Sequence, residues 1–201
     1  MTIEVVLATH NQHKVGEFQR ILGAAMPDLT VVAYDGPEPV EDGVTFAENA
    51  LIKARTAAAH TGRIALADDS GIAVDVLGGS PGIFSARWAG PGRGDRENLE
   101  LLLAQLSDIA PEHRAASFRC TIALVVPERL PHGGVEHVSE GVWPGRLATQ
   151  ATGANGFGYD PIFVPEGYEV SSAELPPETK NKISHRARAF TDLIPALRSL
   201  L

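Results

Sequence analysis

The sequence predicts an α/β protein built on a long mixed central sheet with flanking helices, and two patterns along its 201 residues carry that prediction. In the first half of the chain, short apolar runs typical of buried strands alternate with stretches of helical spacing, which favours parallel strands joined by helices. In the second half, two long apolar runs flank a turn-rich stretch, which favours an antiparallel hairpin.

Strands and helices alternate through the first half of the chain. The run VVLA predicts a strand at 3–8, and KVGEFQRILG keeps the spacing of a helix at about 12–23. Thr45 and Glu48 form the pattern of a capping box, so Glu48 is interpreted as a helix-start residue rather than a metal ligand. The other elements expected here are a strand at about 29–33, a helix at 46–60, a strand at 64–68, a glycine-rich stretch at 70–94 and a helix at about 95–106.

The second half is expected to contain the hairpin, a glycine-rich loop and a terminal helix. Strands are predicted at 116–126 and 135–142 around PERLPHGG, and ATGANGFGYDPIFVP is predicted to lead from a loop into a strand. The last helix is placed at about 184–200, with a kink or restart at Pro195. Cys120, the single cysteine, belongs to an alternating apolar row in the strand at 116–126 and is interpreted as a core residue.

Composition and charge limit the classes of function. A chain that is 44% hydrophobic and 21% charged suits a single globular domain over 1–201 with a sizeable core, or two tightly packed lobes. The formal net charge of -8 argues against a general nucleic-acid binder, although an acidic protein can bind one nucleotide where a few cations gather. Because the sequence shows no basic leader and no run of transmembrane length, we expect a cytoplasmic protein that does not bind membranes.

The first strand is followed by the polar stretch THNQHK, from Thr9 to Lys14. Where a buried parallel strand passes into a helix, free N–H groups at the helix start can hold an anion, and Lys14 adds a positive charge. The stretch contains no glycine, so it is not a Walker A loop, and phosphate binding would need side chains as well as backbone. The alternative is an ordinary strand-to-helix turn with Asn11 as its N-cap.

Two adjacent carboxylates, Asp68 and Asp69, are expected at the end of the strand that begins at Ile64. At the carboxyl end of a buried strand such groups can hold Mg²⁺ against a phosphate or activate water. Successive side chains of an extended chain point to opposite sides, so one carboxylate should face a cleft while the other accepts backbone N–H bonds and supports the turn. The alternative is an Asx-type turn with both acids solvated.

Other charged residues could belong to the same site. Lys53 follows Asn49 by one turn on an alanine-rich helix, whose small-residue surface could pack closely on the sheet and aim Lys53 at the rim of the cleft. It could equally be a solvated lysine. Glu41 and Asp42 are acids on a loop, and we place them near the metal.

Two later stretches could bind a nucleoside. GANGFGYDPIF combines glycines with Phe157, Tyr159 and Asp160, so the backbone can approach a ligand and a ring can stack on a base, unless it is only a turn before a strand. The second stretch, KNKISHRARAF, gathers cations at a helix start, where the helix dipole favours acids; a solvated basic helix end is the alternative. His185 and Arg186 could donate to O6 and N7 of a 6-oxopurine. The cations of this stretch are Lys180, Lys182, His185, Arg186 and Arg188.

A further pattern offers a different function. GGSPG at 78–82 matches the nucleophile elbow of serine hydrolases, and the order Ser80, Asp160, His185 suits that fold. No glycine-rich oxyanion loop precedes it, and so short a pattern arises easily by chance among twenty glycines. A serine esterase is therefore kept as an alternative.

Taken together, five segments in order resemble the inosine triphosphate pyrophosphatase family, house-cleaning enzymes that hydrolyse deaminated purine nucleoside triphosphates. The resemblance covers nearly the whole chain. The family usually has TGN or TNN where this chain has Thr9, His10 and Asn11, so His10 departs from the pattern. It implies two lobes around a nucleotide-binding cleft, dependence on Mg²⁺ and a homodimer. The segments are LATHNQHK, TFAENALIKA, ADDSGIAVDVLGGSPGIFSAR, GFGYDPIF and KNKISHR.

The resemblance also implies roles for individual residues. Asp69 would be the general base and a metal ligand, with Glu41 as the second acidic metal ligand and Ser70 on the substrate. The triphosphate would be held by Thr9, His10, Asn11, Gln12, His13 and Lys14. The base and sugar pocket would be lined by Phe157, Gly158, Tyr159 and Asp160 and completed by Lys180, His185 and Arg186.

The implied activity is Mg²⁺-dependent hydrolysis of ITP, dITP and XTP to the nucleoside monophosphate and pyrophosphate, which keeps these nucleotides out of DNA and RNA. A non-catalytic purine nucleotide sensor is the second alternative, beside the esterase. A carboxylate at Asp69 argues against a pure sensor, because a protein that only binds phosphates has no need of an acid beside them except to hold a metal.

Overall fold

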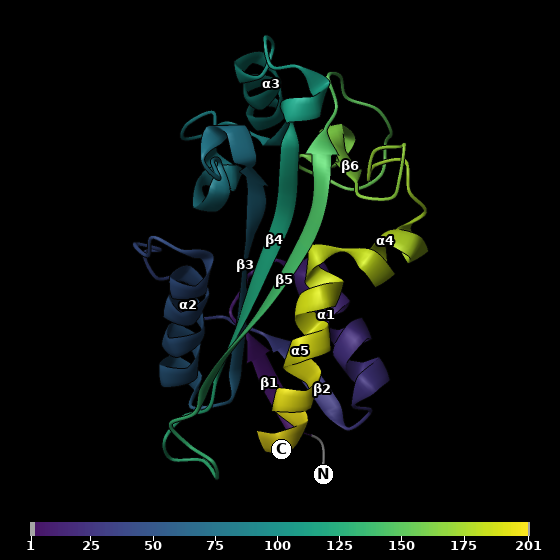
Figure 1. Ribbon diagram of the computed structural model, residues 1–201. Helices are drawn as coiled ribbons and strands as arrows, with labels where there is room; N and C mark the ends of the chain where they lie inside the picture. Colours follow the sequence, from purple (N-terminus) through teal and green to yellow (C-terminus); the bar gives the residue numbers. More distant parts are fainter. Residues whose placement is uncertain (1–2, 201) are drawn as a thin grey trace. The chain divides into compact units, whose positions relative to one another are not determined.

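The computed structural model describes residues 3–200, with only the backbone described at His13. Six strands form one sheet in the order β2-β1-β3-β4-β5-β6 (Figure 1). β1 is parallel to β2 and to β3, whereas β6 is antiparallel to β5, so the predicted mixed sheet is confirmed. The strands are β1 (Ile3–Leu7), β2 (Leu29–Ala33), β3 (Ala65–Val74), β4 (Ala115–Val125), β5 (Glu136–Leu147) and β6 (Phe163–Pro165).

The helices follow the predicted order, with one addition and one difference at the carboxyl end. The addition is the short helix α4, and the difference is that α5 continues through Pro195 without restarting. Phe190, Leu193 and Leu197 are buried on either side of that proline, so packing of one helix face outweighs the local effect of proline. The helices are α1 (Gln12–Ala25), α2 (Phe46–Thr61), α3 (Asp95–Gln105), α4 (Pro177–Ile183) and α5 (His185–Leu200).

The chain forms two compact units, each assembled from separated stretches. Unit 1 comprises Met1–Asp69, Thr121–Glu140 and Ala189–Leu201, and unit 2 comprises Ser70–Cys120 and Gly141–Arg188. Three strands, β3, β4 and β5, contribute residues to both units. The cleft between two lobes that the resemblance implies stays a prediction.

In unit 1 the sheet is covered by helices on both faces. Figure 1 shows α2 on one side of the sheet and α1 with α5 on the other. The α2 face consists of alanines, among them Ala50, Ala54 and Ala57, and it packs in one apolar cluster with Val6 and Ala65 of the strands. Such small side chains let the helix lie close to the sheet, which confirms the expectation for the alanine-rich segment. The α1 and α5 side is closed by an edge-to-face ring pair, Phe18 and Phe190, with centroids 4.8 Å apart.

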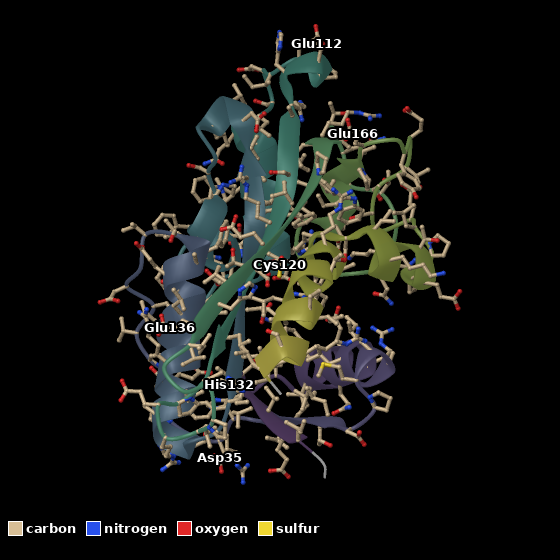
Figure 2. All side chains as sticks on the ribbon, turned by 60° about the horizontal axis from the view of Figure 1, so that its bottom comes forward. Asp35, Glu112, Cys120, His132, Glu136 and Glu166 are labelled. Carbon is tan, nitrogen blue, oxygen red and sulfur yellow. The ribbon has the colours of Figure 1, made fainter. Side chains whose placement is uncertain are left out.

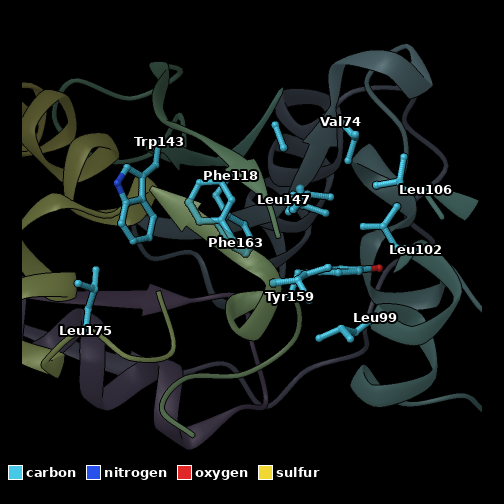
Figure 3. Close-up of a cluster of buried hydrophobic side chains, with 13 residues drawn as sticks. Val74, Leu99, Leu102, Leu106, Phe118, Trp143, Leu147, Tyr159, Phe163 and Leu175 are labelled. Carbon is cyan, nitrogen blue, oxygen red and sulfur yellow. The ribbon is translucent and has the colours of Figure 1, made fainter. Parts of the chain in front are cut away.

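Unit 2 has its own apolar core, shown in Figure 3. It joins residues of β3, α3, β4 and β5 to the ring of Phe163 on β6. That ring meets Phe118 edge-on at 4.7 Å and Trp143 at 5.2 Å between centroids. Aromatic packing of this kind therefore joins the short last strand to the hairpin.

Two strands are longer than the sequence patterns predict. The strand that starts at 65 was expected to end at 68, but β3 continues through Asp69 and Ser70 to Val74. Ile72 and Val74 are buried in the unit 2 core, and the Ile72 N–H donates to Ser85 Oγ at 2.9 Å. β5 likewise runs to Leu147, beyond the expected end at 142, because Leu147 is buried in the same core. Burial of these later residues outweighs the weak strand preference of the polar Asp-Asp-Ser-Gly segment.

Cys120 lies on β4 (Figure 2), forms no disulfide with any residue that the structure describes and is 1% exposed. Its interpretation as a core residue rather than a nucleophile is confirmed. The capping box of α2 is also confirmed, since Glu48 N donates to Thr45 Oγ1 at 3.1 Å and Thr45 N to Glu48 Oε2 at 3.2 Å. Between residues 3 and 200, no helix is long and apolar enough to cross a membrane.

A buried arginine in unit 2 offers a test of this packing. Arg114 is 3% exposed and donates to three backbone carbonyls, those of Ile109 at 2.9 Å, Ala148 at 3.1 Å and Leu106 at 2.6 Å. Arg114→Met would leave these acceptors buried without their donors, so we expect the free energy of unfolding in urea to fall by about 3 kcal/mol.

The matched control is Arg96→Met, because the Arg96 side chain is 85% exposed and its ion pair with Glu100 lies at the surface. This variant should change the free energy of unfolding by less than about 0.5 kcal/mol. Equal effects of the two substitutions would contradict the structural role of Arg114.

Candidate active site

The stretch between β1 and α1 is both a capped helix start and part of a cavity. Asn11 Oδ1 accepts the N–H of Lys14 at 3.3 Å, and Thr9 Oγ1 accepts the N–H of Asn11 at 3.1 Å, so the predicted N-cap role of Asn11 is confirmed. Of the residues expected to hold phosphate, Thr9, His10 and Lys14 line the cavity, whereas Asn11 and Gln12 do not. The side chain of His13 lies outside the described part of the structure.

The cavity lies within unit 1 and has a volume of about 180 Å³. Pockets that enclose whole drug-sized ligands are larger, about 300–1,000 Å³, so this one is too small to enclose a whole nucleotide. It is formed where β1 and β2, which are parallel neighbours, both end. Its lining residues are Ala8, Thr9, His10, Lys14, Tyr34, Glu38, Pro39, Glu41, Lys53 and Asp68.

Asp68 and Lys14 form an ion pair in this cavity. Lys14 Nζ lies 3.0 Å from Asp68 Oδ1 and 3.2 Å from Oδ2, and the Asp68 side chain is 3% exposed. The prediction that Asp68 stands at the end of a strand is wrong, because β3 continues past it. The paired register of β1 with β3 nevertheless stops at Leu66, so Asp68 lies just beyond the parallel part of the sheet. That position brings the carboxylate to the start of α1.

Asp69 faces a second lysine. Lys53 Nζ lies 3.2 Å from Asp69 Oδ1 and 3.1 Å from Glu41 Oε2, so one ammonium bridges the two carboxylates expected to bind metal. The expectation that Lys53 points into the site is confirmed, and the alternative of a solvated lysine is wrong, because its side chain is 14% exposed. The alternative that Asp68 and Asp69 are both solvated is wrong as well.

The charged groups in this cluster shift one another's pKa values. Burial raises the pKa of Asp69; Lys53 opposes the shift, Glu41 and Asp68 reinforce it, and the net direction is upward. Burial alone would lower the pKa of Lys53, but the carboxylates of Asp69 and Glu41 outweigh it and raise that pKa. Asp69 is therefore a stronger base than an ordinary aspartate, and Lys53 keeps its proton.

One oxygen of Asp69 has the character of a metal ligand. Asp69 Oδ2 is buried and accepts no hydrogen bond from the residues that the structure describes. Mg²⁺ in nucleotide sites is usually held by one or two carboxylates together with substrate phosphates, and Asp69 with Glu41 supplies such a pair. Within residues 3–200 no three His, Cys, Asp or Glu side chains are gathered as a complete metal cage. These residues fit a cation that the substrate helps to bind.

In unit 2 the GFGYD loop is held by Asp160. The Asp160 side chain is 4% exposed; its Oδ2 accepts from Phe157 N at 2.8 Å and from Lys180 Nζ at 2.5 Å, and its Oδ1 accepts from Ser172 Oγ at 2.7 Å. Gly156 has φ +79°, and a Cβ there would lie 2.1 Å from Asp160 Oδ2. Glycine is thus required for the loop to close on the carboxylate.

The two aromatic residues of this loop differ in exposure. Phe157 is 67% exposed, with Lys180 Nζ 5.8 Å from its ring centroid. Tyr159 belongs to the unit 2 core and donates its hydroxyl to the Ser85 carbonyl at 2.8 Å; burial, reinforced by Asp95, raises its pKa. Phe157 is therefore the ring that is free to stack on a ligand, and Gly158 N is fixed by Asp95 Oδ2 at 2.9 Å.

His185 and Arg186 are not part of a solvated helix end. They are 9% and 8% exposed, and the His185 ring stacks on Phe118 with centroids 5.0 Å apart and planes 15° apart. Arg188 is used structurally, since its Nη1 donates to the Val142 carbonyl at 2.9 Å. The alternative of a solvated basic end is therefore wrong for His185 and Arg186.

The esterase alternative receives no support. The Ser80 backbone folds back on β3, where its carbonyl accepts the N–H of Val74 at 3.0 Å. Asp160 is bound by Lys180 and Ser172, and the His185 ring is stacked on Phe118. These contacts give Asp160 and His185 other roles than those of a triad.

Sequence reasoning missed Tyr34, Glu38 and Pro39 as lining residues. A signal was available: β2 was predicted next to a parallel β1, and the carboxyl ends of parallel neighbours meet at one edge of a sheet. The stretch that follows β2 therefore had to lie beside the stretch that follows β1.

The comparisons with known proteins agree with one another. A family model described as the Ham1 family matches residues 5–196. A dITP/XTP pyrophosphatase of Leifsonia xyli subsp. xyli is 62% identical over 198 residues, which cover 98% of this chain and 97% of the relative. Another, of Streptomyces avermitilis, is 52% identical over 201 residues and 98% of each chain.

Solved structures give the same result. A HAM1 protein from Coxiella burnetii superposes with a TM-score of 0.88 at 39% identity, covering 98% of this chain and 100% of its own. The Ham1 protein of Staphylococcus aureus superposes with a TM-score of 0.86 at 37% identity, covering 98% of each chain.

The raised pKa of Asp69 predicts a gain in stability when its charge is removed. Because the folded protein holds this proton more tightly than the unfolded chain, wild-type stability falls as the pH rises through the raised pKa and stays lower above it. Asp69→Asn should therefore have a higher urea midpoint than the wild type at about pH 7. The difference should close below about pH 4, where the unfolded aspartate is also protonated.

Unfolding should be followed by circular dichroism in EDTA at both pH values, with Asp75→Asn as the control because Asp75 is exposed. A lower midpoint for Asp69→Asn than for the wild type at neutral pH would show that Asp69 stabilises the fold as an anion.

Proposed function

The chain belongs to the Ham1 family, and on that premise we propose that it is a nucleoside-triphosphate pyrophosphatase acting on deaminated purine nucleotides. The substrates proposed are ITP, dITP and XTP, and the products are the nucleoside monophosphate and pyrophosphate. Removal of these nucleotides would keep them out of DNA and RNA. A homodimer and a cytoplasmic location belong to the same proposal.

The observation that carries the proposal is the bridging of Asp69 and Glu41 by Lys53 beside the Lys14–Asp68 pair. Two ammonium groups and three carboxylates gathered in this way are suited to a polyanion together with a divalent cation, and all of them except Asp69 line the cavity. The names of the similar proteins, dITP/XTP pyrophosphatase, agree with this chemistry.

Asp69 and Glu41 would hold Mg²⁺, and the buried Oδ2 of Asp69 supports that choice. The ion, when bound, would neutralise phosphate charge and lower the pKa of a water molecule. Lys53 would keep Asp69 and Glu41 oriented, since its ammonium contacts both.

Asp69 is proposed as the general base. The oxygen of water forms a bond to the α-phosphorus, the bond from that phosphorus to the bridging oxygen breaks, and pyrophosphate leaves with the electron pair. The proton of the attacking water goes to Asp69. Lys14 offsets the charge that grows on the leaving pyrophosphate, and Thr9, His10, Asn11, Gln12, His13 and Ser70 complete the proposed phosphate set.

Unit 2 is proposed to recognise the base and sugar. The exposed ring of Phe157 would stack on the purine, while Gly158, Tyr159, Asp160 and Lys180 shape the loop that presents it. His185 and Arg186 would donate to the 6-oxo group. Adenine carries a donor at that position, which cannot accept from His185 or Arg186, so we expect it to be rejected.

Product analysis tests the reaction. Wild-type protein and Asp69→Asn should be incubated with Mg²⁺ and, separately, with ITP, XTP, dITP, GTP and ATP, and monophosphate, pyrophosphate and free phosphate measured. We expect the wild type to release monophosphate and pyrophosphate from ITP, dITP and XTP and to leave GTP and ATP nearly intact. Asp69→Asn should lose at least about a hundredfold in kcat while it still binds ITP, because a general base contributes that much or more.

Ser80→Ala is the control and should hydrolyse ITP at the wild-type rate. Free phosphate with a diphosphate product would mean that a different bond is cleaved. Binding of ITP without turnover by the wild type would favour the sensor, and loss of activity in Ser80→Ala would revive the esterase.

Arg186→Ala tests base recognition. Loss of a buried donor to the 6-oxo group should lower kcat/KM for ITP by about tenfold to a hundredfold, with little change in the low rate on ATP. Steady-state rates on both nucleotides decide the matter, with the exposed Lys182→Ala as the control for loss of charge. Equal losses on ITP and ATP would argue that Arg186 binds phosphate.

A further inference from the structure

His10, the residue that departs from the family's pattern, has two acceptors on its ring. Its Nδ1 lies 3.2 Å from Glu38 Oε1, and its Nε2 lies 3.1 Å from the Gly36 carbonyl oxygen. A carboxylate and a carbonyl can only accept, so both contacts are hydrogen bonds only when both ring nitrogens carry protons. The geometry therefore matches an imidazolium.

The environment of His10 is mixed in charge. Its ring stacks on Tyr34 with centroids 6.1 Å apart and planes 17° apart, and the rings of Tyr34 and His60 are nearly perpendicular with centroids 5.6 Å apart. The carboxylate that faces the ring of His10 is Glu38. The pKa of the Tyr34 hydroxyl is raised, mainly by burial and secondly by Asp35, the next residue in the chain. The other charged residues of the same cavity are Lys14, Glu41, Lys53 and Asp68.

His10 contacts the segment that leads to Glu41. The start of this segment is folded against Tyr34: the Tyr34 hydroxyl donates to the Pro37 carbonyl at 3.2 Å, and a Cβ on Gly36 would lie 2.3 Å from that hydroxyl oxygen. At the far end of the segment, Glu41 contacts Lys53 at 3.1 Å. His10 thus attaches the middle of segment 36–41 to the loop that follows β1.

We propose that His10, as an imidazolium bound to Glu38 and the Gly36 carbonyl, is a positioning residue that holds segment 36–41, and with it Glu41, at the phosphate cavity. The side chain acts on the segment rather than on the substrate, so the place of His10 in the proposed phosphate set rests on its backbone. The part of this inference that concerns nucleotide affinity rests on the proposed function, whereas the attachment itself does not.

The sign of one effect separates this role from direct contact with phosphate. If the imidazolium contacted phosphate, Glu38 would compete with the substrate, and Glu38→Gln would lower KM. If His10 holds the segment, Glu38→Gln loosens Glu41 and raises KM. We expect KM for ITP to rise about fivefold in Glu38→Gln and in His10→Ala, with a smaller change in kcat, as for the loss of one partly exposed charged hydrogen bond.

The double variant His10→Ala/Glu38→Gln should raise KM no more than either single variant, because both remove the same interaction. Asp28→Asn removes a carboxylate elsewhere on the surface of unit 1 and should leave KM unchanged. A fall in KM in Glu38→Gln, or additive effects in the double variant, would overturn the proposal.

A second measurement uses the protein without nucleotide or metal. Amide ¹⁵N relaxation should give rigid order parameters for Glu38, Val40 and Glu41 in the wild type. Those values should fall in His10→Ala but not in Asp28→Asn. Unchanged order parameters in His10→Ala would overturn the attachment, and they would do so even if the protein hydrolysed no nucleotide.

Discussion

The constraint on which the arrangement of unit 1 depends is that two adjacent buried carboxylates each need a lysine partner. Asp68 and Asp69 are adjacent on β3, and a carboxylate removed from water without a partner would be strongly unfavourable. Lys14 reaches one from the start of α1 and Lys53 reaches the other from α2, so each helix supplies one charge. The ammonium groups that compensate the two buried carboxylates are also the groups that a polyphosphate would need. Lys14 and Lys53 would therefore serve both the stability of the fold and the proposed binding of phosphate.

Much of the fold is predictable from local patterns, because its first strands and helices obey them. β1 and β2 are short apolar runs, and α2 begins with a capping box that leaves little ambiguity. The extent of β3 was not predictable in the same way. Asp68 to Gly71 have the composition of a turn, and only the burial of Ile72 and Val74 in the unit 2 core keeps the chain extended through them. That contact joins distant parts of the sequence, so no local pattern records it.

The candidate site, like the fold, could be predicted from the sequence only in part. The sequence could indicate that Lys14 lies at the cavity, whereas for Lys53 it left a solvated position open until the structure placed its ammonium beside Asp69 and Glu41. A sequence motif cannot distinguish a residue that touches the ligand from a residue that holds the first one in position. In GFGYD, Phe157 is exposed, whereas Tyr159 and Asp160 are used to build the loop, and the difference depends on partners elsewhere in the chain such as Ser85 and Lys180.

The anchoring of the Phe157 loop has a thermodynamic consequence. The N–H of Phe157 donates to Asp160, and the N–H of Gly158 donates to Asp95. The backbone that carries the Phe157 ring is therefore ordered when the protein folds. A flexible loop would have to lose that freedom on binding, and the loss would be subtracted from the affinity. Here the backbone loses that freedom when the protein folds, so a larger share of the attraction in the proposed stacking of a base on Phe157 would be available as affinity.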